Sequence, residues 1–107
     1  MIKNETDLQY LYDGERLEII LRGEIDHHSA AAFRREADAL ISGKRPRTVA
    51  LNLEKIGFMD SSGLGFIMGR FALTQKLGAT LVLKKPNKAV QKICRLAGLE
   101  RMVKTEK

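Results

Sequence analysis

Apolar residues recur along the chain with two periods, and this pattern predicts strands and helices in alternation. Two runs rich in β-forming residues, about 7–12 and 15–24, flank the pair Asp13-Gly14 near the N-terminus. An Asp-Gly pair between such runs predicts a β-hairpin, because both turn residues tolerate positive φ angles. The first two strands are therefore expected to be antiparallel neighbours.

Helical spacing of apolar residues predicts three helices, which are expected to end at Gly43, Gly78 and Gly98. The inner face of the first helix is formed by Phe33, Ala37, Leu40 and Ile41. The second helix begins at Ser61, and its inner face is formed by Leu64, Ile67, Met68 and Phe71. The third helix follows a capping Asn87, and the residues expected to point inward are Val90, Ile93, Cys94 and Ala97.

Shorter apolar runs between the helices predict three further strands. In "RTVALNL", residues 47–53, apolar side chains alternate with Ala50 and Asn52; "ATLVLK", residues 79–84, is nearly continuous in β-forming residues. The second of these runs is typical of a strand covered on both faces. "ERMVKT", residues 100–105, has room for one last short strand. The order β-β-α-β-α-β-α-β predicts one α/β domain, a mixed and mostly parallel sheet with an N-terminal hairpin and helices packed on it.

Chemically distinctive residues follow two of the predicted strands. "GEIDHHSA" brings Asp26 after the second strand, and "FMDSSGLG" brings Asp60, Ser61 and Ser62 after the third. Binding sites in such sheets form at the carboxyl ends of the strands. If these two strands are neighbours, the four residues converge on one edge of the sheet.

Catalysis and metal binding are weak interpretations of these motifs. A serine hydrolase needs the G-x-S-x-G elbow and a histidine base, whereas Ser61 follows Met-Asp and the histidines, His27 and His28, lie far upstream. Asp26 and the two adjacent histidines point in different directions, which does not suit a tetrahedral metal site. No enzyme activity, metal or cofactor is therefore expected.

A phospho-aspartate receiver, with Asp60 as the acceptor, is also unfavoured. Receiver chemistry needs a further acidic pair at the same edge to hold a metal beside the phosphoryl group, and the second strand is followed by one aspartate and two histidines. Lys84 at the end of the next strand fits a receiver, but a lysine at a strand end is also common.

The start of the second helix supports two roles, a structural cap and a switch. Asp60 or Ser61 is expected to cap the helix. A phosphate on a serine here would lie at the positive end of the helix dipole and would add about −1.5 to −2 charges beside Asp60, enough to repel a docked partner. Small residues also form a stripe along this helix: Ser62, Gly65, Gly69 and Ala72. A glycine inside a helix lowers its stability by up to ~1 kcal/mol relative to alanine, so the two glycines need a reason. Either close packing on the sheet or close approach of a partner would provide one.

The net charge of +6 leaves nucleic-acid binding as an alternative function. The pairs of adjacent Lys and Arg residues are scattered along the sequence, and only six aromatic residues are present, so stacking on nucleotide bases is unfavoured. A single cysteine, Cys94, the lack of a membrane-length apolar run and a start without the apolar core of a signal peptide together predict a cytoplasmic protein. Cys94 itself is expected in the core.

"GEIDHHSA" together with "LNLEKIGFMDSSGLGFIMGR" closely resembles the sporulation-type anti-sigma-factor antagonists of the STAS domain family, across nearly all of residues 1–107. The resemblance implies a STAS fold and a cytoplasmic partner, an anti-sigma factor that is also an ATP-dependent serine kinase. It implies phosphorylation of Ser61, reversal by a serine phosphatase, and partner contacts through Asp26 and the turn formed by Asp60, Ser61, Ser62 and Gly63. A STAS module of a stress-response pathway is the alternative within the family, although "DHHS" favours sporulation. The family usually continues into another helix after the last strand, whereas this sequence stops at Lys107. The terminal helix is therefore expected to be short or missing, and the face that it covers in the family is expected to be different here.

Overall fold

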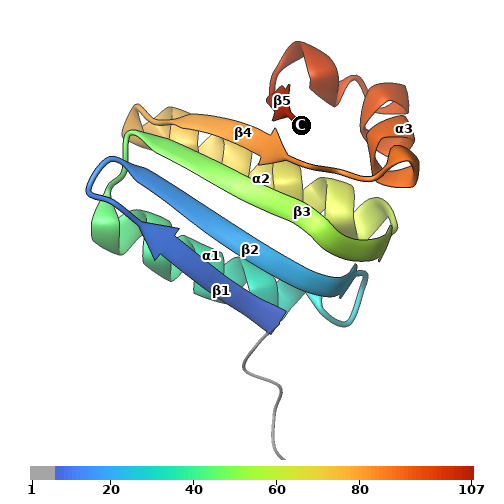
Figure 1. Ribbon diagram of the computed structural model, residues 1–107, viewed down its shortest axis with the longest axis horizontal. Helices are drawn as coiled ribbons and strands as arrows, with labels where there is room; N and C mark the ends of the chain where they lie inside the picture. Colours follow the sequence, from blue (N-terminus) through green and yellow to red (C-terminus); the bar gives the residue numbers. More distant parts are fainter. Residues whose placement is uncertain (1–6) are drawn as a thin grey trace, which may run out of the picture.

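The computed structural model describes residues 7–107, which form a mixed five-stranded sheet in the order β1-β2-β3-β4-β5 (Figure 1). The elements are, in chain order, β1 (Leu8–Tyr12), β2 (Arg16–Ile25), α1 (Ala30–Lys44), β3 (Thr48–Met59), α2 (Ser61–Leu77), β4 (Thr80–Lys84), α3 (Lys88–Leu96), a 3₁₀ turn (Leu99–Arg101) and β5 (Lys104–Glu106). β1 is antiparallel to β2, and the other neighbours are parallel. The predicted fold class and order of elements are confirmed. The signal-peptide prediction rests partly on residues 1–6, which lie outside the described residues.

The hairpin between β1 and β2 is confirmed, but its turn differs from the predicted one. Of the two predicted turn residues, Gly14 has a positive φ, at 97°, and Asp13 does not. The Asp13 carboxylate instead closes the connection by accepting hydrogen bonds from the backbone N–H groups of Glu15 at 2.9 Å and Arg16 at 2.8 Å. Asp13 therefore serves as a side-chain acceptor rather than as a left-handed turn residue.

Two of the three predicted helix ends are confirmed. Gly78 and Gly98 follow α2 and α3 with φ angles of 76° and 78°. The prediction for α1 is wrong, because the helix passes Gly43 and its left-handed cap is Arg45, with φ of 49°. The Arg45 N–H bonds to the carbonyl of Ile41 at 3.0 Å, and Pro46 prevents the helix from continuing.

The predicted inner faces of α2 and α3 need correction. Met68 is 48% exposed, whereas the buried residues of α2 are Gly63, Phe66, Ile67, Arg70 and Thr74. Arg70 and Thr74 stay inside because each has a polar partner, Asp38 for the guanidinium and the Phe71 carbonyl for the hydroxyl. Ala97 is exposed, whereas Cys94 is buried as predicted.

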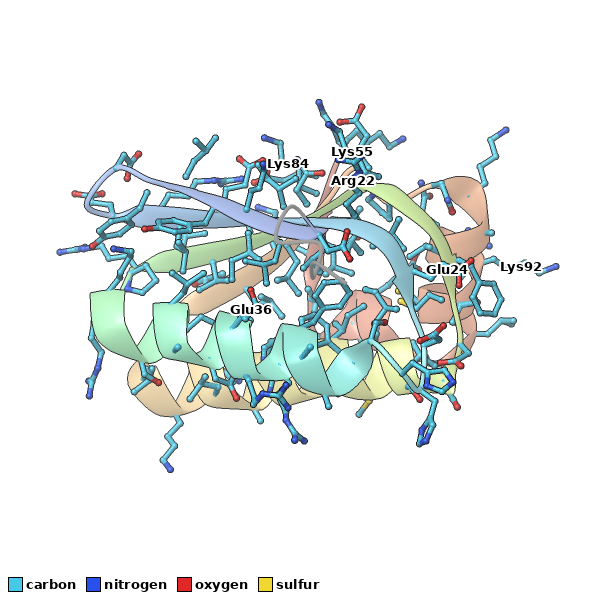
Figure 2. All side chains as sticks on the ribbon, turned by 90° about the horizontal axis from the view of Figure 1, so that it is seen from below. Arg22, Glu24, Glu36, Lys55, Lys84 and Lys92 are labelled. Atoms are coloured by element: carbon cyan, nitrogen blue, oxygen red, sulfur yellow. The ribbon has the colours of Figure 1, made fainter. Side chains whose placement is uncertain are left out.

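α1 and α2 lie side by side on one face of the sheet, and the apolar core fills the space between them and the strands (Figures 1 and 2). β2 alternates between buried and half-buried residues from Arg16 to Leu21, whereas β3 is buried without interruption from Val49 to Leu53. Figure 2 shows Arg22, Lys55 and Lys84 on the opposite face of the sheet, which α1 and α2 leave open. None of the helices in residues 7–107 combines the length and apolar character needed to cross a bilayer.

Charged side chains cross-link the strands on this open face. Glu18 on β2 accepts hydrogen bonds from Asn52 on β3 at 2.8 Å and from Lys84 on β4 at 3.0 Å. Arg16 makes a bidentate pair with Glu106 on β5, at 2.6 and 3.2 Å. Burial raises the pKa of Glu18, but the bonds from Asn52 and Lys84 outweigh it and lower the pKa overall. The network ties β2 to every parallel strand of the sheet.

Candidate functional site

The two motifs singled out in the sequence meet at the carboxyl ends of β2 and β3. The last residues of these parallel strands, Ile25 and Met59, are register partners, and Asp26 and Asp60 follow them directly. The backbone N–H of Asp60 donates to the Ile25 carbonyl at 3.3 Å, so the pairing extends into the turn. The predicted convergence of Asp26 with Asp60, Ser61 and Ser62 is therefore confirmed.

Asp60 caps α2. Its backbone is extended, and its carboxylate accepts a hydrogen bond from the N–H of Ser62 at 2.7 Å. The Asp60 carbonyl accepts the next two N–H groups, those of Gly63 at 2.9 Å and Leu64 at 3.3 Å. Asp60 thus supplies the acceptors for three N–H groups at the helix start, those of Ser62, Gly63 and Leu64.

Ser61 is the first residue of α2, and its side chain does not cap the helix. Its side chain is exposed, and within residues 7–107 its hydroxyl makes no hydrogen bond. Ser62, by contrast, is half-buried and engaged through its N–H. Neither serine hydroxyl makes a hydrogen bond within residues 7–107, so the two serines differ in exposure, and Ser61 is the one that an external group reaches more readily.

Gly63 lets α2 approach the end of the sheet. A Cβ on this residue would overlap the Met59 side chain at Cγ, would lie 2.7 Å from its Sδ and would lie 3.2 Å from the Ile25 carbonyl oxygen. Met59 is 1% exposed, so any movement of its side chain takes place inside the core. Gly63 therefore sets the position of the helix start, which gives it a structural role within the predicted site.

Asp26 organises the neighbouring turn before α1. Its carboxylate accepts hydrogen bonds from the N–H groups of Ser29 at 3.0 Å and His28 at 2.9 Å. The Ser29 hydroxyl completes the turn by accepting from the Asp26 N–H at 3.0 Å and donating to the Glu24 carbonyl at 2.7 Å. The backbone bond from Ser29, followed by that from His28, holds the pKa of Asp26 below its usual range. Asp26 is consequently an anionic surface residue beside the start of α2.

The alternatives considered for these residues find no support in the geometry. Residues 7–107 contain no group of three or more His, Cys, Asp or Glu side chains able to hold a metal ion. Lys84, which a receiver would use beside Asp60, is paired with Glu18 on the open face of the sheet. His27 and His28 contact each other edge to face, with ring centroids 5.8 Å apart.

The small residues of α2 line a groove rather than a packed interface. Apart from their chain neighbours and the backbone of their own helix, no described atom lies within 4 Å of a Cβ built on Gly65 or Gly69, so packing on the sheet does not explain these glycines. Both line a hollow of about 500 Å³ between α1 and α2, together with Ser62. Ala72, the last member of the predicted stripe, does not line this groove. The sequence pattern located half of the groove but missed the half contributed by α1, because only the packing of the two helices creates it.

Comparison with known proteins assigns the chain to a family. Residues 13–107 match the STAS domain. The chain belongs to the STAS domain family. This STAS domain is 35% identical over 79 residues to the anti-sigma F factor antagonist of Paenibacillus polymyxa, an alignment that covers 74% of this chain and 68% of that relative. The resemblance stated from the two sequence motifs is confirmed.

Solved structures related to this STAS domain have the same fold. The anti-sigma-factor antagonist SpoIIAA in its unphosphorylated form superposes with a TM-score of 0.79 at 29% identity, over 94% of this chain and 88% of that chain. SpoIIAA in its phosphorylated form, described as a Bacillus cell fate determinant, superposes with a TM-score of 0.71 at 28% identity, over 94% of this chain and 91% of that chain. The Paenibacillus polymyxa protein and SpoIIAA are thus two relatives that are named anti-sigma-factor antagonists.

Proposed function

We propose that this STAS domain is an anti-sigma-factor antagonist that is switched off by phosphorylation of Ser61. The unmodified form binds an anti-sigma factor that is also an ATP-dependent serine kinase, and the sigma factor is released. Asp26 and the turn Asp60–Gly63 form the contact surface, in which the buried Gly63 sets the position of the turn and the other residues meet the partner. The observation that carries the proposal is the state of Ser61, an exposed hydroxyl without a hydrogen bond at the first position of a capped helix. SpoIIAA, a relative of similar sequence and fold, exists in unphosphorylated and phosphorylated forms.

The kinase supplies the catalysis in this scheme, and the STAS domain supplies the acceptor. The Ser61 oxygen attacks the γ-phosphorus of ATP, the bond to ADP breaks, and the hydroxyl proton passes to a base of the kinase. A serine phosphatase later hydrolyses the phosphoserine and restores the hydroxyl. No residue of the STAS domain has to act as a catalyst.

Electrostatics explains why one phosphate would end the complex. A phosphoserine carries about −1.5 to −2 charges near neutral pH, and it would lie beside Asp60 and close to the anionic Asp26. A kinase surface that had accepted a neutral hydroxyl there would now face several negative charges with little water to screen them. Within the free STAS domain the same phosphate is tolerated, because the helix start carries a partial positive charge.

Phosphosite mapping tests the proposal directly. The STAS domain is incubated with ATP and the anti-sigma kinase of the same organism, and the modified residue is identified by mass spectrometry. Phosphate is expected on Ser61, absent from Ser61→Ala and retained in the matched control Ser62→Ala. Ser61→Ala should still bind the kinase, whereas Ser61→Asp should bind it weakly. Phosphate on another residue, or loss of kinase binding by a folded Ser61→Ala, would refute the assigned role.

A further inference from the structure

The groove between α1 and α2 begins beside the proposed phosphorylation site. Ser62 lines it at the start of α2, and Gly65 and Gly69 line it along the next two turns. Ala30 and Ala31 form the facing wall on α1. Because these side chains are small, a partner that contacts Ser61 can continue along the two helices, which lie side by side in both views (Figures 1 and 2).

Every ionisable group among the described residues that line the groove is basic. These groups are His27 and Arg34 on the α1 side and Arg70 on the α2 side. Arg34 is exposed, and within residues 7–107 it has no ion-pair partner. The groove therefore presents at least one uncompensated positive charge to whatever enters it.

Arg70 adds a rigidly held guanidinium to this charge. The residue is 5% exposed, its Nε lies 2.8 Å from an oxygen of Asp38, and its guanidinium carbon lies 5.1 Å from the centre of the Phe66 ring. Arg34 and Arg70 line the same groove, and burial, with a smaller effect of the Arg34 charge, lowers the pKa of Arg70 although the Asp38 charge raises it. Asp38 offsets the charge of Arg70, whereas no acidic residue among the described residues that line the groove offsets the charge of Arg34.

We propose that this groove docks an acidic side chain, Asp or Glu, of the same anti-sigma kinase, with Arg34 as its principal partner. The inference rests on the proposed function and adds a second contact to it. Two observations favour a carboxylate over an apolar group: the ionisable residues of the lining are all basic, and among the described residues the buried guanidinium of Arg70 has one counter-ion, Asp38. The helical glycines then have a reason to be retained, since larger side chains would close the floor of the groove.

Binding of the purified kinase to four variants tests the proposal, measured by calorimetry with the unmodified STAS domain as reference. Arg34→Glu should weaken binding about tenfold or more, because it places a negative charge against the incoming carboxylate. Arg35→Glu is the matched control, since it makes the same charge change at the next exposed position of α1, outside the groove. Gly69→Leu should also weaken binding by filling the groove. Gly43→Leu, at an open helical glycine of α1 away from the groove, should leave binding unchanged.

The chemistry of the partner is tested by charge exchange. Lysine is substituted in turn for each acidic residue on the sigma-binding face of the kinase, and one substitution should restore binding to Arg34→Glu while weakening binding to the unmodified chain. Circular dichroism and thermal unfolding confirm that each variant is folded.

The possible failures are distinguishable. A kinase that neither binds nor phosphorylates the unmodified chain overturns the proposed function and the groove contact with it. A kinase that phosphorylates Ser61 but binds Arg34→Glu and Gly69→Leu as tightly as their controls overturns the groove contact alone. Loss of binding by Gly69→Leu without any effect of Arg34→Glu overturns the acidic partner and leaves only an apolar contact.

Discussion

Replacement of Gly63 by alanine tests whether this glycine holds α2 against the sheet. The added methyl group would meet Met59 Cγ and Sδ and would lie 3.2 Å from the Ile25 carbonyl oxygen. Met59 and Ile25 are 1% and 0% exposed, so neither can yield without disturbing the core. The helix start or the Met59 side chain has to shift.

The cost follows from two opposing terms. Overpacking in a well-filled core typically costs about 1–3 kcal/mol. Alanine gains at most ~1 kcal/mol over glycine inside a helix, and less in the first turn. Gly63→Ala should therefore lower the free energy of unfolding by about 1–2 kcal/mol, which corresponds to a Tm lower by about 4–8 °C for each kcal/mol in a domain of this size.

Gly65→Ala is the matched control, two residues further along the same helix. Beyond its chain neighbours and the backbone of its own helix, no atom in residues 7–107 lies within 4 Å of the added methyl group, so helix propensity acts alone and the variant should gain up to ~1 kcal/mol. Urea unfolding followed by circular dichroism measures both variants. If Gly63→Ala proved as stable as Gly65→Ala, the close approach of Gly63 to Met59 would not constrain the helix start.

Two further predictions concern stability and reactivity. The pKa of Glu18 in the folded chain lies below its ordinary 4.5, so its contribution is present above that pH and is lost as the pH falls through the folded value. Glu18→Gln should cost about 1–2 kcal/mol near neutral pH, and urea unfolding should show the difference from the unmodified chain shrinking in acid. Burial raises the pKa of the Cys94 thiol, so alkylation by iodoacetamide should be slow in the folded chain and should accelerate on unfolding, as mass spectrometry would show. Rapid alkylation under native conditions would contradict the burial of Cys94.

Local patterns in the sequence were sufficient to predict the cap and the convergence at the sheet edge. The Asp60 cap depends on residue type within three positions, and the meeting of Asp26 with Asp60 depends only on β2 and β3 being parallel neighbours. Both can be predicted from the hydrophobic periodicity of the elements and from the rule that strands joined by a helical crossover are parallel.

The inner face of α2 could not be predicted from hydrophobic pattern, because the helix is apolar on several sides. Met68 fits the helical period but is exposed, while Arg70 interrupts the pattern and is buried. The burial of Arg70 depends on Asp38, which comes from α1 and is 32 positions away in the chain. The groove combines Arg34 of α1 with residues of α2, so neither the groove nor its charge has a signature in a single segment.

Capping, packing and the exposed hydroxyl belong to different residues at the helix start, and this separation limits what a phosphate on Ser61 would do to the fold. Had Ser61 been the cap, phosphorylation would have removed a contact that typically contributes about 1 kcal/mol to the helix. Asp60 makes that contact instead, through Ser62 N–H, and Gly63 carries the packing. A phosphate on Ser61 therefore changes the surface that a partner meets while the first turn keeps its bonds. By the same reasoning, Ser61→Ala should change the free energy of unfolding by no more than about 0.5 kcal/mol, as for other exposed positions, so its effect on phosphorylation can be measured in a chain that folds normally.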